Sequence, residues 1–410
     1  MSTGRDRLER LVEVGGVFSP GAPIDQHDLF AGRIAQVERV IDAVGSKGQH
    51  VIIFGEKGVG KTSFANTLKD IFSARIAIVV KVNCDESDDF STMWHKVLGE
   101  IEYVEEESGI GFRPRRTMTT KTLAENLAKE IVPDDVRRAL QLLRNSIVIF
   151  DEFDRVGKPS TNRLMADTIK NLSDNTVRCT VVIVGVADTV DGLFAEHASI
   201  DRSLCEIEMP RMSSAELKEI VTKAHAKLSF PMSIADDALD LMVLLSQGLP
   251  HYTHLLGLNA TKKAVSQDRS VVTLADLHDG LEESLNDTKQ TIRNKYQQAV
   301  SSQRQDSLYK EVLLACALAE VDDLGFFISA SVRDPLSQIA GKQYDIPGFS
   351  QHLNAFSSPE RGSILEKRGT SRRFRFRFEN PLFQPYVIMR GLKDGLLGGD
   401  LRHLLEKSRR

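Results

Sequence analysis

The chain has 410 residues, which is too long for one compact core and favours two or three domains. With 41% hydrophobic and 27% charged residues, it has the composition of a folded globular protein, and a disordered or fibrous class is excluded. The net charge of −4 gives no overall reason to expect nucleic acid or a membrane as partner.

Membrane insertion and secretion are not expected. The first residues lack the apolar segment of a signal peptide, and no apolar run approaches the ~20 residues of a membrane helix. The cysteines are widely spaced and form no CxxC pair or Cys/His cluster, so free thiols in a reducing, cytoplasmic setting are expected; they are Cys84, Cys179, Cys205 and Cys316.

The first half of the chain alternates short apolar strands with helices. Residues 1–30 contain several glycines and prolines and are expected to form an irregular lead-in. The expected strands are Val51–Phe54, Ile76–Val82, Ile147–Phe150, Thr180–Val186 and Cys205–Met209. The expected helices are Gly32–Val44, Lys61–Phe72, Asp89–Ile101 and Asp134–Leu143, the last with Asp134 as its N-cap, whereas Glu105–Lys121 is expected to be a surface loop. This alternation predicts an α/β domain at 31–211, a parallel sheet with helices on both faces.

The strands stop after Pro210, and the chain becomes helical. Helices are expected at Ser213–Leu228, Ala235–Ser246, His251–Val265 and Leu274–Leu285, which together predict an all-helical lid domain at 212–290. The polar stretch Asn286–Asp306 fits either a linker, placed at 291–305, or an exposed helix.

The last hundred residues have a different order of elements. Three short helices, Leu308–Ala319, Val332–Ile339 and Gly348–Phe356, precede two strand-like pieces, Ser363–Glu366 and Arg372–Phe378. Three helices followed by a β-hairpin suggest a winged-helix domain at 306–395, with a C-terminal tail at 396–410.

A phosphate-binding motif joins the first strand to the following helix. The sequence Gly55-Glu-Lys57-Gly58-Val59-Gly60-Lys61-Thr62 fits GxxxxGK[ST] between a strand and a helix, which is the context that this P-loop (Walker A) motif requires, and Ser63 follows it. Glycines let the backbone N–H groups point at phosphates, and the helix N-terminus adds its dipole. Lys61 is expected to reach the β- and γ-phosphates, and Thr62 to ligate Mg²⁺.

A second acidic motif follows the third expected strand. This buried apolar strand delivers Asp151 to its carboxyl end, where ligands bind in such sheets, so Asp151 is expected to hold the metal. Glu152 is then placed to polarise the attacking water, which favours hydrolysis of ATP and not binding alone. The two motifs predict a Mg·ATP site between Gly55–Ser63 and the Asp151–Glu152 pair (Walker B).

These motifs, their spacing and the helical unit after the sheet resemble AAA+ ATPases. The likeness spans about Phe30–Val265 and is greatest to the initiator and loader branch, the origin-recognition ATPases, and to related bacterial regulatory ATPases. The resemblance implies that the segment ending in Gly32-Arg33 packs near adenine. It implies that Asn83 pairs with the catalytic glutamate until the site becomes active. The alternative for Asn83 is a simple strand-terminating turn.

The resemblance extends to three further functional positions, at two of which this sequence has a different residue from the one usual in the family. Asp188 falls at the first sensor, usually Asn, Ser or Thr, and an ionised carboxylate cannot donate; a helix N-cap is the alternative. Arg202 falls where the family keeps an arginine finger, against the alternative of a structural salt bridge. His251 occupies the second-sensor position, usually Arg, and neutral His is a weaker phosphate partner. These departures favour the slow turnover of a nucleotide switch.

In the initiator ATPases the winged helix grips DNA. Here the candidate wing strand alternates, with Phe374, Phe376 and Phe378 on one side and arginines on the other, and an arginine row suits phosphate contacts; the arginines are Arg372, Arg373, Arg375 and Arg377. The alternative is a purely structural role, in which the aromatic side of the strand packs in the domain core and the arginine side faces solvent.

The leading hypothesis is therefore a slow, Mg-dependent ATPase that acts as a switch: whether ATP or ADP is bound determines how the protein binds double-stranded DNA. We also expect the chain to self-associate or to bind a partner subunit. The alternative is a bacterial regulatory or defence ATPase whose C-terminal domain binds a protein.

Overall fold

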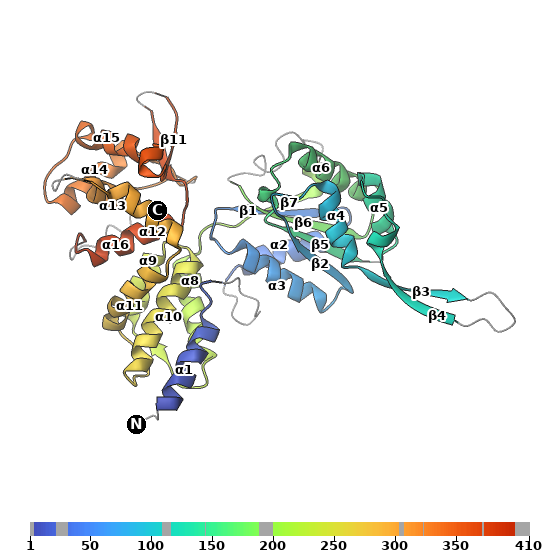
Figure 1. Ribbon diagram of the computed structural model, residues 1–410, viewed down its shortest axis with the longest axis horizontal. Coiled ribbons are helices and arrows are strands. Elements are labelled where there is room, and N and C mark those ends of the chain that lie inside the picture. Colours follow the sequence, from blue (N-terminus) through green and yellow to red (C-terminus); the bar gives the residue numbers. More distant parts are fainter. Residues whose placement is uncertain are drawn as a thin grey trace. The chain divides into compact units, whose positions relative to one another are not determined.

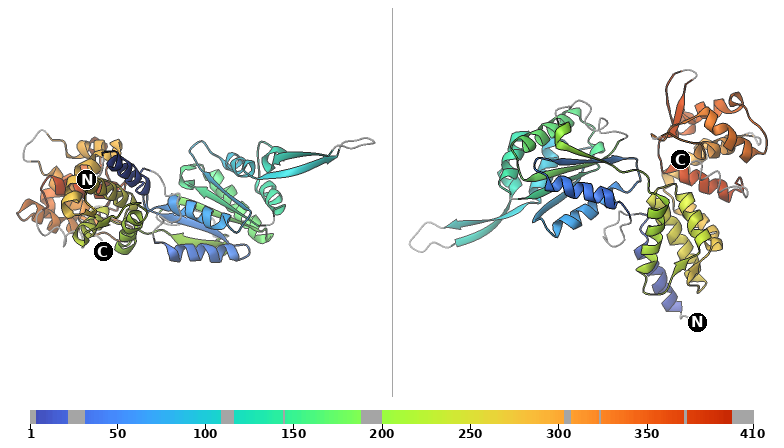
Figure 2. Two further views of the ribbon diagram at one scale, coloured as in Figure 1. Left: turned by 90° about the horizontal axis from the view of Figure 1, so that it is seen from below. Right: turned by 180° about the vertical axis from the view of Figure 1, so that it is seen from behind.

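The computed structural model describes residues 4–21, 32–108, 116–143, 145–187, 200–302, 307–322, 324–370 and 373–397. The chain divides into two compact units, which are described separately (Figures 1 and 2). One consists of Pro23–Glu56 and Gly60–Pro210, and the other of Met1–Ala22, Lys57–Val59 and Arg211–Arg410.

The first unit is built on a five-stranded parallel sheet in the order β2-β5-β6-β1-β7. Its strands are β1 (His50–Gly55), β2 (Ile78–Asn83), β5 (Ser146–Asp151), β6 (Cys179–Val186) and β7 (Leu204–Glu208). Strands β1 and β5 are buried along their whole length, which explains their continuous apolar sequences. The predicted α/β fold with a parallel sheet is confirmed.

Helices cover both faces of this sheet (Figures 1 and 2). Helices α4 (Phe90–Gly99), α5 (Pro133–Gln141) and α6 (Pro159–Asp174) lie on one face, and α2 (Ile34–Gly45) and α3 (Lys61–Ser73) on the other. The sole tryptophan, Trp94 of α4, is fully buried and meets the Phe150 ring edge-on at 5.1 Å. Helix α6 was not among the expected elements.

Two local expectations in this unit are wrong. The expected surface loop contains an antiparallel pair, β3 (Glu102–Ser108) and β4 (Arg116–Thr122), because a two-stranded ribbon needs no core face and so leaves no hydrophobic periodicity in the sequence. Helix α5 begins at Pro133, and Asp134 lies in its first turn without being the N-cap. Proline at the first helical position has no N–H to leave unpaired.

The lid portion of the second unit is a group of helices. It comprises α1 (Gly4–Val17), α8 (Ser214–Ala226), α9 (Asp236–Ser246), α10 (Pro250–Ser266) and α11 (Leu274–Asp287), with a two-residue parallel pair, β8 (Ser233–Ile234) and β9 (Val271–Val272). Helix α8 starts with a capping box formed by Ser213 and Glu216.

The N-terminal residues contradict the expected irregular lead-in. Helix α1 packs on α10, and Phe18 is buried between the rings of His225 and His254. Gly257 makes this packing possible, because a Cβ there would lie 2.5 Å from the Phe18 ring. The anchoring contacts come from residues more than 200 positions away, so local sequence patterns do not reveal them.

The C-terminal portion has the element order of a winged helix. It contains α13 (Tyr309–Ala317), β10 (Phe327–Ile328), α14 (Ser329–Ala340), α15 (Ile346–Phe356), β11 (Leu365–Arg368) and β12 (Arg375–Phe378), and the strands form an antiparallel sheet in the order β10-β12-β11. The hairpin thus has a third strand, and β11 begins two residues later than expected.

Two further helices flank the winged helix. The region expected as a linker holds α12 (Gln290–Val300), whose Tyr296 is buried and meets the ring of Tyr386 at 5.5 Å. Tyr386 belongs to α16 (Phe383–Lys393), which packs on α13, α11 and α9. The winged helix and the lid therefore share one packed unit, and this stretch is neither a linker nor an exposed helix.

Among the described residues, no helix is both long and apolar enough to cross a bilayer.

Candidate functional site

The P-loop has the backbone conformation that phosphate binding requires. Strand β1 ends at Gly55 and helix α3 begins at Lys61, with Lys57, Gly58 and Val59 at the tip of the loop between them. Gly55, Gly58 and Gly60 have φ values of 149°, 94° and 96°, which L side chains rarely adopt. A Cβ at Gly55 would also lie 2.4 Å from the Met209 carbonyl oxygen, so only glycine fits there.

Lys61 is folded back onto this loop. Its Nζ donates to the carbonyl oxygens of Gly55 and Glu56, each at 2.9 Å, and the side chain is largely buried. The ammonium thus lies at the mouth of the helix N-terminus, where a phosphate group is favoured.

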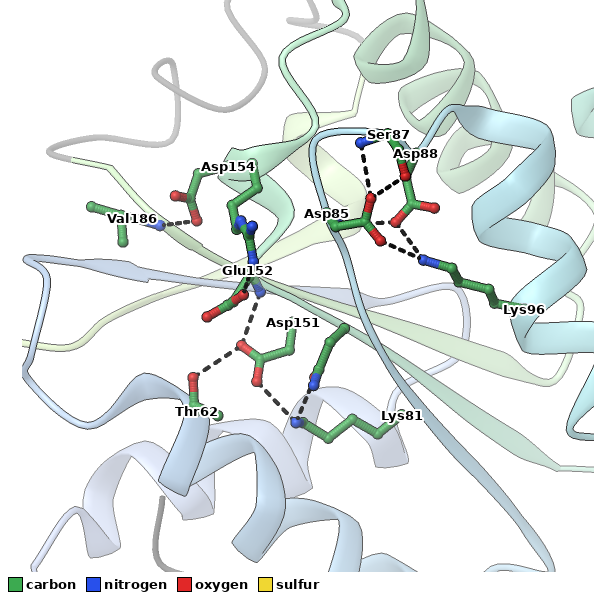
Figure 3. A network of polar contacts seen from close by, with 12 residues as sticks. Thr62, Lys81, Asp85, Ser87, Asp88, Lys96, Asp151, Glu152, Asp154 and Val186 are labelled. Atoms are coloured by element: carbon green, nitrogen blue, oxygen red, sulfur yellow. Dashed lines mark hydrogen bonds and ion pairs between the residues drawn. The ribbon is translucent and has the colours of Figure 1, made fainter. Parts of the chain in front are cut away.

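Asp151 lies at the carboxyl end of β5, facing the first turn of α3 (Figure 3). Its Oδ1 accepts from the backbone N–H of Glu152 at 3.0 Å and from Thr62 Oγ1 at 3.4 Å, and the carboxylate is almost fully buried. A hydroxyl and a carboxylate converge here as hard oxygen ligands, which fits Mg²⁺. Among the described residues, no group of three or more His, Cys, Asp or Glu could hold a metal, and Thr62 and Asp151 are the candidate ligands that meet here.

Lys81 is part of this site and was not anticipated from the sequence. Its Nζ forms an ion pair with Asp151 Oδ2 at 2.9 Å and donates to Asn83 Oδ1 at 3.0 Å. Lys81 and Asn83 lie two residues apart on β2, beside β5, in a register that pairs Asn83 with Asp151. The available signal was a lysine inside an otherwise apolar strand, two residues before a polar strand end.

The catalytic candidate Glu152 has a different partner from the one expected. It adopts φ of 57°, uncommon for a residue with a side chain, and its carboxylate pairs with Arg155 at 2.9 Å. Asn83 is engaged by Lys81, so the expected contact between Asn83 and Glu152 is replaced by two others. Half of the Glu152 side chain remains exposed.

The other candidate residues of this unit either have partners outside the Thr62–Asp151 site or are not among the residues that the structure describes. Asp188 is not among the described residues. Arg202 is 75% exposed and pairs with Asp174 at 2.8 Å, which agrees with the alternative of a structural salt bridge. Of the segment expected near adenine, Arg33 is described, and its guanidinium donates to the Pro210 carbonyl.

Residues 44–193, which include both motifs, match the sequence family described as AAA domain. Over these residues the chain is similar to an AAA domain of the P-loop ATPase class. A comparison with curated proteins finds no match.

Three solved structures are similar to this chain, and the first of them supports the same fold. The Walker-type ATPase of Pyrococcus abyssi is 12% identical, with a TM-score of 0.52 and coverage of 91% of this chain and 99% of that chain. The Aeropyrum pernix ORC1 protein, solved in complex with DNA, is 15% identical, with a TM-score of 0.49 and coverage of 93% and 97%. The Cdc6p protein of Pyrobaculum aerophilum is 15% identical, with a TM-score of 0.45 and coverage of 96% and 98%. The resemblance to AAA+ ATPases is confirmed at the level of the AAA domain.

His251, the second-sensor candidate, belongs to the other unit. It lies in the first turn of α10, where its Nδ1–H donates to the Pro20 carbonyl at 2.6 Å. Burial lowers the pKa of His251 below its usual value despite this hydrogen bond, so the ring is neutral near pH 7. A neutral imidazole with one nitrogen engaged is a poor substitute for arginine.

The wing arginines alternate as expected but carry acidic partners. Arg377 pairs with Glu366 at 2.6 Å and Arg375 with Asp322 at 3.1 Å. Arg373 is exposed, and Arg372 lies outside the described residues. On the other face Phe376 is buried and stacks on Phe327, as expected for a core face, and Phe378 meets the same ring at 6.4 Å. Phe374 precedes β12 and instead lies beneath the Lys367 ammonium.

One aromatic residue next to the wing was not predicted from the sequence. The buried Phe326 ring has three guanidinium groups within 5.1 Å of its centroid, those of Arg368, Arg375 and Arg377. These contacts hold the arginine face against an aromatic platform, with Glu366 bound to both Arg368 and Arg377.

Proposed function

We propose that this chain is a Mg-dependent, slow ATPase that acts as a nucleotide switch and whose winged helix binds duplex DNA. The ATPase part is supported by one observation: Lys61, Thr62, Asp151 and Glu152 converge at the carboxyl edge of one sheet. Ligands bind at this edge in α/β folds.

Each residue has a role that follows from its position. Lys61 exchanges its two carbonyl acceptors for phosphate oxygens of ATP, and Thr62 Oγ1 with Asp151 would hold Mg²⁺. Mg²⁺ bound there supplies neutralisation of the phosphate charge. Glu152 leaves Arg155, orients a water and accepts its proton. The exposed ion pair of Glu152 is weak, so the exchange costs little.

The test of this part is hydrolysis by Glu152→Gln. The variant is expected to bind ATP within a few-fold of wild type and to lose about 10²–10⁴ in kcat, the usual effect of removing a general base. Glu100→Gln, which changes an exposed acid at the end of α4, is the matched control and should hydrolyse at the wild-type rate. Wild-type turnover in Glu152→Gln would remove Glu152 from the mechanism.

The DNA part is supported by charge concentrated on the wing. Residues 366–377 contain six basic residues and one acid in a chain whose net charge is −4. Their ion pairs are partly exposed, so phosphates can replace the acids. Binding of this kind falls steeply with salt.

A double variant tests DNA binding. Arg373→Ala/Arg375→Ala should weaken binding to duplex DNA and reduce the slope of log K against log[salt] by about 2. Lys310→Ala/Lys393→Ala removes two charges from α13 and α16 and is the control. Hydrolysis is measured with and without DNA at low and moderate salt, and stimulation by DNA is the expected sign of coupling.

A second candidate is a regulatory or defence ATPase whose winged helix binds a protein. Two observations favour it. Helix α15, the third helix of the winged helix, contains no Lys or Arg, and the two arginines of β12 are already paired with acids. If DNA neither binds nor changes the rate of hydrolysis, this candidate replaces the first.

A further inference from the structure

We infer that Lys81 is the resident counter-cation of Asp151: it neutralises the metal carboxylate while no metal is bound, and Mg²⁺ must displace it. This inference rests on the proposed Mg·ATP site. It assigns Lys81 a positioning and selectivity role, which makes Mg²⁺ binding depend on the nucleotide that accompanies it.

The geometry of the pair is built into the sheet. Lys81 lies within β2, whose neighbour β5 ends at Asp151. The lysine stem follows β2 toward the carboxyl edge and brings Nζ to 2.9 Å from Asp151 Oδ2 (Figure 3). Both side chains are enclosed, with 9% and 1% of their surfaces exposed. The ammonium is therefore held at the Asp151 carboxylate by two adjacent strands.

The other groups at Asp151 do not neutralise it. Thr62 Oγ1 and the Glu152 backbone N–H both approach Oδ1 and are uncharged donors. A carboxylate with 1% exposure needs a compensating cation, since burying an unpaired charge is strongly unfavourable. Among the described residues, Lys81 supplies that charge.

Lys81 and Mg²⁺ compete for this carboxylate. Both are cations that use Asp151, and two positive charges a few ångströms apart in a largely buried site repel strongly. Once Asp151 is committed to a metal, Asn83 Oδ1 remains as an acceptor for the ammonium. A free metal ion meets the full repulsion, whereas a metal that arrives with a polyphosphate brings anions that offset it. Lys81 thus selects the metal–nucleotide complex over free Mg²⁺.

A second lysine nearby provides the contrast. Lys96 of α4 pairs with Asp85 and Asp88 at 3.0 and 2.7 Å, in the loop that follows β2 (Figure 3). Its side chain is 40% exposed, and none of its partners is a candidate metal ligand. Removal of Lys96 takes away the same charge from the same domain without touching Asp151.

The experiment is a Mg²⁺ titration of binding of fluorescent ADP to the full chain. ADP is used so that hydrolysis plays no part. In Lys81→Met the Mg²⁺ concentration at half-maximal binding should fall at least about tenfold, because a repelling charge is removed. Lys81→Arg keeps the charge and should stay within about twofold of wild type, and Lys96→Met should be unchanged. The melting temperature of Lys81→Met in EDTA should fall, because Asp151 is left buried without its cation.

Each outcome of this titration supports or contradicts the inference. An unchanged or raised Mg²⁺ midpoint in Lys81→Met overturns the inference and makes Lys81 a support for the metal ligand. If Lys81→Met does not fold, Lys81→Gln, which is neutral and can hydrogen-bond to Asp151 and Asn83, carries the same expectation. If wild type binds no nucleotide at any Mg²⁺ concentration, the proposed function fails. Nucleotide binding by wild type together with unaltered Lys81 variants contradicts only the inference.

Discussion

The carboxyl edge of the five-stranded sheet and the β11–β12 hairpin both place charged groups along strands, but they treat them differently. At the sheet edge, Lys81 and Asp151 are enclosed and tied to one another. On the hairpin, Arg375 and Arg377 keep between a fifth and a half of their side chains exposed while paired with acids.

The difference lies in what can replace each partner. An enclosed pair exchanges only with a ligand that brings equivalent charge to the same place, whereas an exposed pair exchanges with any anion at small cost. The sheet edge is therefore suited to a defined ligand, and the hairpin to a loosely specified polyanion or an acidic protein surface.

The largest expected effect is on the rate of ATP hydrolysis and concerns Arg202, whose ion pair with Asp174 is exposed like those of the hairpin. If Asp174 releases it to the phosphates of a neighbouring subunit, Arg202→Ala should lower the rate of hydrolysis about 10³-fold with ATP affinity unchanged. Asp174→Asn should keep the wild-type rate. Mixing Arg202→Ala with Glu152→Gln should restore activity, because some interfaces then combine an intact glutamate with an intact arginine. An unaltered rate in Arg202→Ala identifies the salt bridge as its whole role.

The second-largest expected effect is on ATP binding at the enclosed sheet edge. Lys61→Ala should weaken ATP binding about 100-fold, since it removes a charge-assisted contact to phosphate in a largely buried position. Equilibrium binding measures this directly. Lys57→Ala, at the tip of the same loop, is the control and should change affinity by less than tenfold; equal losses in both variants would show that charge alone, and not the position of Lys61, determines binding.

A third prediction uses buried groups that have no charged partner. Burial lowers the pKa of His225 and of His254 to about 4, so the folded lid keeps both neutral while the unfolded chain takes up protons below about pH 6.5. The free energy of unfolding should fall by about 2 kcal/mol per histidine between pH 7.5 and 5. Urea unfolding of His225→Gln should lose less stability over this range, whereas the exposed His278→Gln should follow wild type. Identical pH profiles for all three would refute it.

The smallest effect separates the two candidate partners of the wing. Glu366 is bound to Arg368 and Arg377, which hold its pKa below the usual value although partial burial opposes this. Glu366→Gln should raise affinity for duplex DNA several-fold at low salt, because it removes the negative charge that pairs with two guanidinium groups, and should cost about 1 kcal/mol of stability or less. Weaker DNA binding in this variant would show that the paired arrangement itself is what DNA requires.

The sheet and the P-loop were predictable because their signals are local. Buried parallel strands such as β1 and β5 appear as apolar runs, and the loop at Gly55–Thr62 needs its glycines and lysine in a fixed order. Helix α6 was also accessible, since Leu164, Met165, Ile169 and Leu172 have helical spacing. Helix α16 is harder to find, because Pro385 lies near its start.

What could not be predicted depends on residues distant in the chain. The partner of Lys81 is 70 positions away and becomes its neighbour only because β2 lies next to β5. The Phe326 platform likewise forms only once β10 pairs with β12. Charge and periodicity identify which residues alternate, but the pairing of strands determines which of them meet.

The single tryptophan gives the chain a built-in optical reporter. Trp94 is fully enclosed in the first unit, against the ring of Phe150, which immediately precedes Asp151. Its fluorescence therefore comes entirely from the unit that contains the sheet. Emission spectra can follow unfolding of that unit without a label, while circular dichroism, which sums over all helices, also records the other unit. Divergence between the two signals on heating would separate the melting of the two units in one sample.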